Sequence, residues 1–434
     1  MSNKGSAFYK GNKAIFVDFE AEKLSSDGGL IMLEKIERKH HIIKHFSDLI
    51  VDKRHSSYIK HSFHKLLMQR VFLLMQGYQD ANDADLLKED PILNLVLSGK
   101  PGSQPTISRF ENSIDKFQTF SILEAWIDRY VANIGDRKKI IIDIDATDAE
   151  TYGNQQLSLF SGFYNHTMYN ELFFHDGQTG EIILPALRPG NAHSNWWFVA
   201  ILKRVVNKIR DKHPNTTIII RADSGFSSPK FYQYADSQEN FKYTIAIASN
   251  NVLKNKVKRA EDAVRHLYLT NKEKHQHFIG PYSYQAGSWE QSQHCYSKIE
   301  STGKGMNIRH FISNFEQEDA RNIYFDFYVK RGDASENRIK EAKSMCFSAR
   351  LSNHEFWPNF FRLIISSIAY EMFRLIKLII KTTNFEKAKK WQVNNIRLFL
   401  LKIGGTIKTT KRKVFLSFSK SFIYKDLFWQ LITN

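Results

Sequence analysis

Residues 139–145 read Lys-Ile-Ile-Ile-Asp-Ile-Asp, and residues 216–223 read Thr-Thr-Ile-Ile-Ile-Arg-Ala-Asp. Both are short apolar runs rich in β-branched residues, which is the composition of a buried β-strand. Each run ends in an aspartate, Asp145 in the first and Asp223 in the second. Because open α/β sheets bind ligands outside the carboxyl ends of their strands, we expect both aspartates at a functional site.

Strand and helix patterns alternate around these two runs. Residues 171–175 and 181–187 have the composition of two further strands, and the intervening DGQTG (176–180) is typical of a turn. Residues 196–210 have helical spacing, and residues 241–248 resemble a fifth strand. The pattern predicts an α/β fold in which helices flank a mixed sheet.

The composition favours a polyanionic partner. Lys and Arg number 62 against 45 Asp and Glu among 434 residues, a net charge of +17. Such an excess attracts nucleic acid, since neutralised phosphates release condensed counterions. The two cysteines, Cys295 and Cys346, exclude a disulfide framework and a thiolate zinc site, and they fit a reducing cytoplasm. The apolar stretch 360–380 is interrupted by charges, so no membrane span is expected.

The regions on either side of the strands are basic. Residues 1–135 look mostly helical after a short strand near residues 14–19, and a helix start is expected near Gln104, with Thr106 or Ser108 as N-cap. Lys and Arg again dominate after Lys381. A DNA-binding surface explains this charge, and ordinary solvated helix faces are the alternative.

Carboxylates at strand ends suit metal-dependent phosphodiester chemistry. Two Mg²⁺ ions about 3.5–4 Å apart can activate an attacking oxygen and stabilise a leaving one, and Mg²⁺ prefers oxygen ligands. Glu336, at the start of a predicted helix, is the best third carboxylate. Asp143 shares a strand face with Asp145, so periodicity does not separate the two. A strand-end aspartate can also serve as a turn former or helix cap.

Three segments carry a family resemblance: IDAT at 144–147, RADSGF at 221–226 and the stretch from YVKR at 328 to Lys343. They resemble the DDE transposases of bacterial insertion sequences, and within these the families numbered 4 and 1380, nearer the second. Supporting stretches are LSSDGGL at 24–30, SRFE at 108–111 and LRPGNAH at 187–193. The resemblance therefore covers most of the chain.

The resemblance implies an RNase H-like catalytic core, a β-rich insertion before the last catalytic residue, a helical N-terminal DNA-binding region and a helical basic C-terminal region. It implies five segments: residues 1–135 binding DNA ends, 136–249 as the first part of the core, 250–325 as the insertion, 326–380 with the catalytic glutamate, and 381–434 as the basic C-terminal region. It further implies cut-and-paste transposition by a homodimer on terminal inverted repeats and target DNA, in the bacterial cytoplasm with the nucleoid.

Site residues carry over position by position. The resemblance implies Asp145, Asp223 and Glu336 as catalytic metal ligands for two Mg²⁺ ions, which Mn²⁺ can replace. It implies DNA phosphate contacts for Tyr328, Arg331 and Lys343.

Two of these positions leave alternatives open. Related chains usually have three residues between the Arg and the Glu, whereas four, Gly332 to Ser335, intervene here, so Asp333 is an alternative carboxylate. For Trp289, in the insertion, the resemblance implies stacking on a flipped DNA base, whereas its residue type favours simple packing of the ring.

Two other functions use the same residues. A DNA-binding protein of this fold without catalysis would need the basic regions but not the carboxylates. A metal-dependent nuclease without strand transfer would need the carboxylates but not such extensive basic regions.

Overall fold

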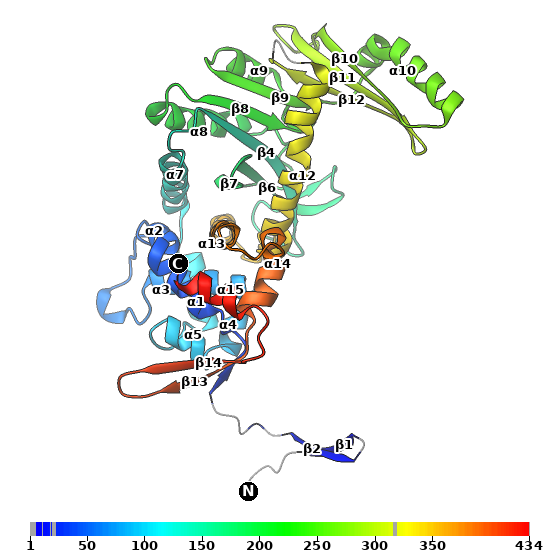
Figure 1. The fold of residues 1–434 in the computed structure, drawn as a ribbon. Coiled ribbons are helices and arrows are strands. Elements are labelled where there is room, and N and C mark those ends of the chain that lie inside the picture. Colours follow the sequence, from blue (N-terminus) through cyan, green and yellow to red (C-terminus); the bar gives the residue numbers. More distant parts are fainter. Residues whose placement is uncertain (1–5, 11, 18, 20–22, 316–318, 434) are drawn as a thin grey trace. The chain divides into compact units, whose positions relative to one another are not determined.

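The structure is a computed structural model that describes residues 6–10, 12–17, 19, 23–315 and 319–433 (Figure 1). The chain forms two compact units. One comprises residues 1–113 and 368–434, and the other comprises residues 114–367. Each unit is described by itself below.

The unit of residues 114–367 is built on a nine-stranded mixed sheet. Its strands are β4 (Lys139–Glu150), β5 (Leu159–Ser161), β6 (His166–Asp176), β7 (Ile182–Arg188), β8 (Thr217–Ala222), β9 (Phe241–Ile247), β10 (His275–Tyr284), β11 (Gln293–Thr302) and β12 (Gly305–Ser313). The helices are α7 (Lys116–Asn133), α8 (Phe198–Lys212), α9 (Pro229–Asp236), α10 (Asn251–Asn271), α11 (Ala320–Asn322), α12 (Lys330–Lys340) and the first part of α13 (Phe356–Lys381).

The centre of the sheet places the two strands of the opening motif side by side. β8 pairs in parallel with β4 on one side and with β9 on the other, and β6 pairs antiparallel with β4 and with β7. The strands β7, β6, β4, β8 and β9 thus lie in that order (Figure 1). All isoleucines of β4 and β8 except the half-buried Ile141 are buried in the core, which explains the apolar runs. The predicted mixed α/β fold is confirmed.

The segment between β9 and the last helices of this unit extends the same sheet. β12 pairs antiparallel with β9, and β11 and β10 follow outward. The segment opens with the 21-residue helix α10, which the sequence did not reveal because charged residues separate its buried Leu253, Val257 and Val264. Val257 and Val264 pack with Ile299 of β11.

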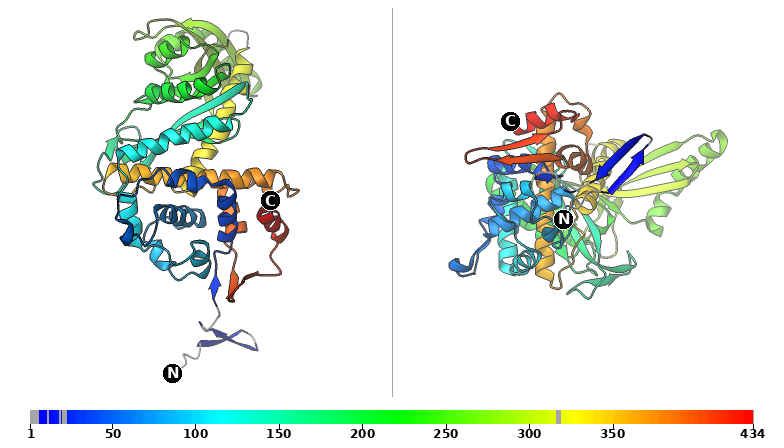
Figure 2. Two further views of the ribbon diagram at one scale, coloured as in Figure 1. Left: turned by 90° about the vertical axis from the view of Figure 1, so that its left-hand side faces the viewer. Right: turned by 90° about the horizontal axis from the view of Figure 1, so that it is seen from below.

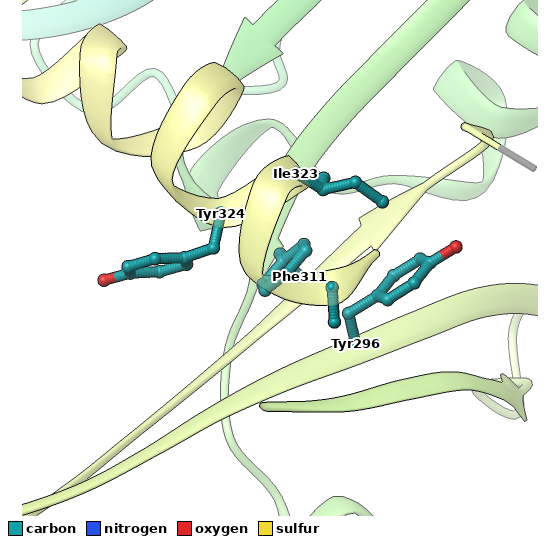
Figure 3. Packing of buried hydrophobic residues seen from close by; sticks show 5 residues of the cluster. Tyr296, Phe311, Ile323 and Tyr324 are labelled. Carbon is teal, nitrogen blue, oxygen red and sulfur yellow. The ribbon is translucent and has the colours of Figure 1, made fainter. Parts of the chain in front are cut away.

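Helical turns of π type interrupt the helices after β12. The π-helix η3 (Ile323–Val329) leads into α12, and a second one, η4 (Glu341–Met345), follows it. η3 is anchored on the extended sheet, where Ile323 and Tyr324 pack with Tyr296 and Phe311 from β11 and β12 (Figure 3). The start of α12 is therefore held by the β10–β12 extension.

The unit of residues 1–113 and 368–434 is mainly helical. Its helices are α1 (Leu30–His40), α2 (Ile42–Ser47), α3 (Phe63–Gln76), α4 (Asp83–Leu86), α5 (Pro91–Val96), α6 (Gln104–Asn112), α14 (Val393–Ile396) and α15 (Lys425–Thr433), with short turns η1 (Ser56–Tyr58), η5 (Ala388–Lys390) and η6 (Arg397–Leu401). Its strands are β1 (Ser6–Lys10), β2 (Lys13–Val17), β3 (Leu24–Ser25), β13 (Gly405–Thr409) and β14 (Val414–Phe418), the last two forming a hairpin, orange-red in Figure 2.

The start of α6 differs from the prediction. The helix begins at Gln104 with Ser103 at the N-cap, so neither Thr106 nor Ser108 caps it. Pro105 explains the difference, because its fixed φ and missing N–H suit the first turn of a helix.

The Asp27-Gly28-Gly29 motif joins the two chain segments of this unit. The amide N–H groups of Gly28 and Gly29 donate to the carbonyls of Ile403 and Leu401 at 2.8 and 3.0 Å. A Cβ atom on Gly29 would lie 2.3 Å from the Leu401 Cα, so only glycine allows this approach. The motif is structural.

Among the described residues, no helix has both the length and the apolar composition needed to cross a membrane.

Candidate active site

Asp145 and Asp223 are neighbours where the parallel pairing of β4 and β8 ends. β8 ends at Ala222, as predicted, but β4 continues to Glu150 because it pairs further with β6, so the prediction that Asp145 ends its strand is wrong. Ile144 of β4 pairs with Ala222 of β8, and each aspartate is the next residue of its chain segment. The Asp145 side chain is 14 % exposed, and its Oδ1 accepts the Ala146 amide at 2.9 Å. Asp223 Oδ1 accepts the Gly225 amide at 2.8 Å. The structure thus brings together the two aspartates that the sequence singled out.

Arg331 lies against this carboxylate pair. Its Nη1 is 3.2 Å from Asp145 Oδ2, and its side chain is 11 % exposed. Burial alone would lower the pKa of Arg331, but the negative charges of Asp145, and more weakly of Asp223, raise it above its usual value. The Arg331 guanidinium also lies 5.8 Å from the ring centroid of Tyr328, whose pKa burial raises. Of the three predicted phosphate-contacting residues, Arg331 thus contacts Asp145 and Tyr328 lies beside Arg331.

Lys343 reaches the same strand further along. Its Nζ lies 2.6 Å from Asp148 Oδ1 and 3.4 Å from Thr147 Oγ1. His166 Nε2 lies 3.1 Å from the other oxygen of Asp148. Burial by itself would raise the pKa of Asp148, but the hydrogen bond from Lys343 and its positive charge lower this pKa below its usual value. Asp148 is ionised and already paired.

Asp143 serves a different purpose from Asp145, although both are on one face of β4. It is fully buried and accepts two bonds from Arg221, at 2.6 and 2.8 Å, and one from Arg338 Nη1 at 3.2 Å. Arg221 also donates to the Phe327 carbonyl at 2.9 Å. Asp143 is thus a structural counter-ion that ties the sheet to η3 and α12, and the shared strand face did not predict a shared role.

Two residues that the sequence did not single out also adjoin the aspartates. Burial, and then the charges of Asp148, Asp145 and Asp223, raise the pKa of Tyr164 to about 12. A Cβ atom on Gly225 would lie 2.7 Å from Ser194 Oγ, so this glycine lets residues 189–197 approach Asp223. The RADSGF and LRPGNAH stretches offered the only sequence signal for this contact.

Arg188 stabilises the same loop, residues 189–197, by hydrogen bonds to its backbone. Its buried guanidinium donates to the carbonyls of Ser194 and Trp196, both at 2.8 Å. Burial lowers the pKa of Arg188 to about 10. It therefore holds the loop beside Asp223 through carbonyl acceptors.

Glu336 does not join the aspartates. Its side chain is exposed and makes no hydrogen bond or ion pair with any residue the structure describes. Arg331 and Arg338, seven residues apart, face β4 together because two helical turns separate them. Glu336 is five residues after Arg331, roughly 140° around an α-helix, and so points elsewhere. The side chain of the alternative carboxylate, Asp333, lies outside the described part of the structure.

Relative to the three-residue spacing that the family resemblance leads us to expect, one extra residue between Arg331 and Glu336 accounts for this orientation. With three intervening residues, the glutamate would lie four residues after the arginine, about 40° away and toward β4. A π turn contains one residue more than an α turn, so it can accommodate one additional residue. Here that π turn is η4, which begins after Glu336. Lys343 therefore keeps its contact with β4, whereas Glu336 is rotated away.

Trp289 is packed. It is 9 % exposed, and its ring lies 4.7 Å from that of Tyr232 and 5.4 Å from that of Tyr284. The structure thus shows a packed ring, and stacking on a DNA base stays a prediction.

The residues present fit a divalent metal in part. Asp145 and Asp223 offer adjacent carboxylate oxygens, the ligands that Mg²⁺ prefers, and Mg²⁺ commonly uses one or two carboxylates plus water and phosphate. No cluster of three His, Cys, Asp or Glu side chains suited to a metal occurs among the residues that the structure describes. The pair suffices for one ion, and a second ion requires a further carboxylate.

Comparison with known proteins assigns the chain to a family. The family model described as "Transposase DDE domain group 1" matches residues 8–434. A solved structure, the cryo-EM structure of a piggyBac transposase synaptic complex with hairpin DNA, is similar at 13 % identity, with a TM-score of 0.45, over 87 % of this chain and 80 % of that chain. No curated protein matches. Because the family model spans nearly the whole sequence, the chain belongs to the DDE transposases.

Proposed function

We propose that this chain cleaves the ends of a DNA element and joins them to target DNA, using a divalent metal held by Asp145 and Asp223. The observation that carries the proposal is the parallel pairing of β4 and β8, which sets these carboxylates side by side next to Arg331. Bound Mg²⁺ would supply Lewis acidity to phosphate and water oxygens. Mn²⁺ prefers the same ligands and would replace it.

The cations around the aspartates would hold the DNA. Arg331 can bind a phosphate through two parallel N–H donors, and Lys343 can act as a point charge. Tyr328 stacks on Phe311 at 6.2 Å between ring centroids, which fixes its hydroxyl near Arg331. These residues would keep the scissile phosphate at the carboxylate pair without any nucleophilic side chain.

Glu336 would complete the site through a change of helical register. If the π turn now at η4 moved to a position before Glu336, the Glu336 side chain would rotate by about 100° around the helix axis, toward β4. Arg338 would then leave Asp143, which keeps Arg221 as its counter-ion. DNA phosphates that draw Arg331 away from Asp145 would favour such a shift.

The proposed substrates are the terminal inverted repeats of the element and its target DNA, bound by a homodimer. The core proposed for the catalysis is RNase H-like, supported by the strand order β7-β6-β4-β8-β9 with β8 parallel to β4. The YVKR and RADSGF motifs support a place nearer the insertion-sequence family numbered 1380. Both cysteines are buried free thiols, which suits action on nucleoid DNA in the reducing cytoplasm.

The test is Mg²⁺-dependent cleavage of a duplex that carries the element's own ends. We expect the wild type to cut and join this DNA, and Asp223→Asn to bind it without cutting. Asp211→Asn, an exposed aspartate in the last turn of α8, is the matched control and should cut normally. Cleavage by Asp223→Asn at the wild-type rate would refute the metal-site assignment.

A second function, DNA binding without catalysis, is favoured by one observation, the outward orientation of Glu336. The same assay separates the two functions. Binding of the ends with no cleavage by the wild type in Mg²⁺ or Mn²⁺ would establish the non-catalytic function. Cleavage without joined products would instead indicate a nuclease.

A further inference from the structure

Two neighbouring tryptophans, Trp196 and Trp197, end the loop of residues 189–197 with much of their surface in solvent. Their rings are stacked, with 4.1 Å between the centroids and 16° between the ring planes. Trp196 is 39 % exposed and Trp197 is 52 % exposed. Tryptophan side chains usually stabilise a protein by burying their large apolar surface, so packing within this unit does not explain the pair.

Trp197 also breaks two local rules of helix formation. It is the N-cap of α8, where serine, threonine, asparagine, aspartate or glycine is preferred. Its side chain caps none of the described N–H groups of this helix. Its φ of 59° lies in the left-handed region, which costs a bulky residue free energy. Backbone strain of this kind is found mainly at functional sites, which points to a use for the Trp197 ring.

The loop holds the pair beside Asp223. Arg188 donates to the carbonyls of Ser194 and Trp196, both at 2.8 Å. Ser194 lies against Gly225, where an added Cβ atom would be 2.7 Å from the serine Oγ. The Gly225 amide in turn donates to the Asp223 carboxylate at 2.8 Å. The two rings are therefore anchored next to one of the two proposed metal ligands, and a group held in place loses little entropy when it binds.

Further exposed aromatic side chains lie in the segment that this loop contacts. The segment, residues 151–165, joins β4 to β6, and the Gly190 amide of the loop donates to its Leu157 carbonyl at 3.2 Å. It exposes three aromatic side chains: Tyr152, Phe160 and Phe163. Exposed apolar groups that gather in this way mark an interaction site rather than a solvated surface.

We infer that Trp196 and Trp197 stack on unpaired bases of the DNA strand that the carboxylate pair cuts. The inference rests on the proposed function, which brings a DNA strand to this place. Stacking on an aromatic ring requires an open base face. Inside a duplex the neighbouring base pairs cover both faces of each base, so the pair selects DNA with unpaired bases near the scissile phosphate. This role is separate from the phosphate contacts proposed for the cations of the site.

The experiment measures binding of the full chain to two fluorescent DNAs without metal. One is a duplex of mixed sequence, and the other is the same duplex with a central bubble of unpaired thymines. Stacking tolerates any base, so the element's own ends are not needed. We expect the wild type to bind the bubble about tenfold more tightly than the paired duplex, and its tryptophan fluorescence to fall on binding.

The variants assign this preference to the two rings. Trp196→Ala/Trp197→Ala should bind both DNAs equally, with the affinity of the wild type for the paired duplex. Trp197→Phe keeps an aromatic face and should retain most of the preference. Trp429→Ala, which removes an exposed tryptophan of the other unit, is the matched control and should behave as the wild type. An unchanged preference in the double variant would overturn the inference.

Trp197→Gly separates binding from folding. Glycine adopts a left-handed φ without strain, so this variant should unfold at the same or a higher temperature than the wild type while its preference for the bubble falls. Size-exclusion chromatography tests a second copy of the chain as the occupant. A dimer of the wild type that the double variant loses, with equal binding of both DNAs by the wild type, would overturn DNA as the occupant.

The outcome can be told apart from that of the cleavage assay. If the tryptophans give the wild type a preference for the bubble but it never cuts DNA with metal, the stacking role stands and the proposed function fails. If the wild type cuts and joins DNA but binds both DNAs equally, the stacking role alone fails.

Discussion

Arg331 Nη1 lies 3.2 Å from Asp145 Oδ2, so the carboxylate proposed to bind metal is paired with a cation of the chain itself. A guanidinium and a metal ion compete for the same negative charge. DNA resolves the competition, because a phosphate can bind Arg331 while the metal binds Asp145. The DNA-free protein should therefore bind metal weakly.

Replacing Arg331 should strengthen metal binding by the DNA-free protein. Arg331→Gln removes the competing charge, and we expect Mn²⁺ to bind roughly fivefold more tightly, equivalent to about 1 kcal/mol. Isothermal titration calorimetry with Mn²⁺ measures this. Lys330→Gln is the control, because exposed Lys330 pairs with Asp326 instead and should leave the affinity unchanged. Equal affinities of Arg331→Gln and the wild type would contradict competition.

Replacing Asp143 should reduce the folding stability, whereas replacing Asp145 should mainly abolish DNA cleavage. Asp143→Asn leaves Arg221 and Arg338 without a full counter-ion at a buried site, which costs about 3–5 kcal/mol of folding free energy. Asp145→Asn affects a partly exposed side chain, so the cost should stay below about 1 kcal/mol while DNA cleavage is lost. Urea unfolding of both variants makes the comparison. The interpretation is wrong if Asp145→Asn is the more destabilised.

The spacing between Arg331 and Glu336 should control activity. Deleting Gly332 places Glu336 four residues after Arg331, on the β4 face, and we expect Mg²⁺-dependent cleavage to be retained or faster. Deleting Asn337 is the matched control, because it shortens the same helix by one residue without moving Glu336 relative to Arg331. That variant should cut more slowly. Loss of cleavage in both deletions to the same degree would count against Glu336 as a metal ligand.

Glu171 should make the folded state less stable as pH rises. Burial raises the pKa of Glu171 to about 8, while the Ser348 hydroxyl donates to its Oε2 at 2.8 Å. Between about pH 4.5 and pH 8 the unfolded chain releases this proton and the folded chain keeps it. Stability therefore falls with pH, by at most about 1.4 kcal/mol per pH unit from this group.

Glu171→Gln tests this, since the amide is uncharged at every pH and of similar size. Urea unfolding at several pH values should show that the variant gains stability relative to the wild type as pH rises from 5 to 8. A constant difference across that range would mean that Glu171 is ionised in the folded state.

Local sequence patterns were enough to predict the centre of the fold and half of the site. The β-branched runs before Asp145 and Asp223 form β4 and β8, since such runs are stable as buried strands. The two strands were expected to end at one edge of the sheet. β8 does end at Ala222, but β4 continues past Asp145 to Glu150, and the register of Ile144 with Ala222 is what brings the two aspartates together. Local pattern was sufficient here because strand identity depends on near neighbours in the chain.

Packing between distant segments determines which of the acidic residues are available for chemistry. Asp143 and Asp145 have the same strand face and similar neighbours in sequence, yet Arg221 and Arg338 claim only Asp143. The spacing of motif residues predicted that Glu336 lies at the site. In the structure the π turn that accommodates the extra residue is η4, which follows Glu336, so the glutamate is rotated away from β4. The pairing of Asp143 with arginines from distant segments depends on packing between elements, and so does the direction in which a helix turns its side chains. A local sequence pattern contains no information on such packing.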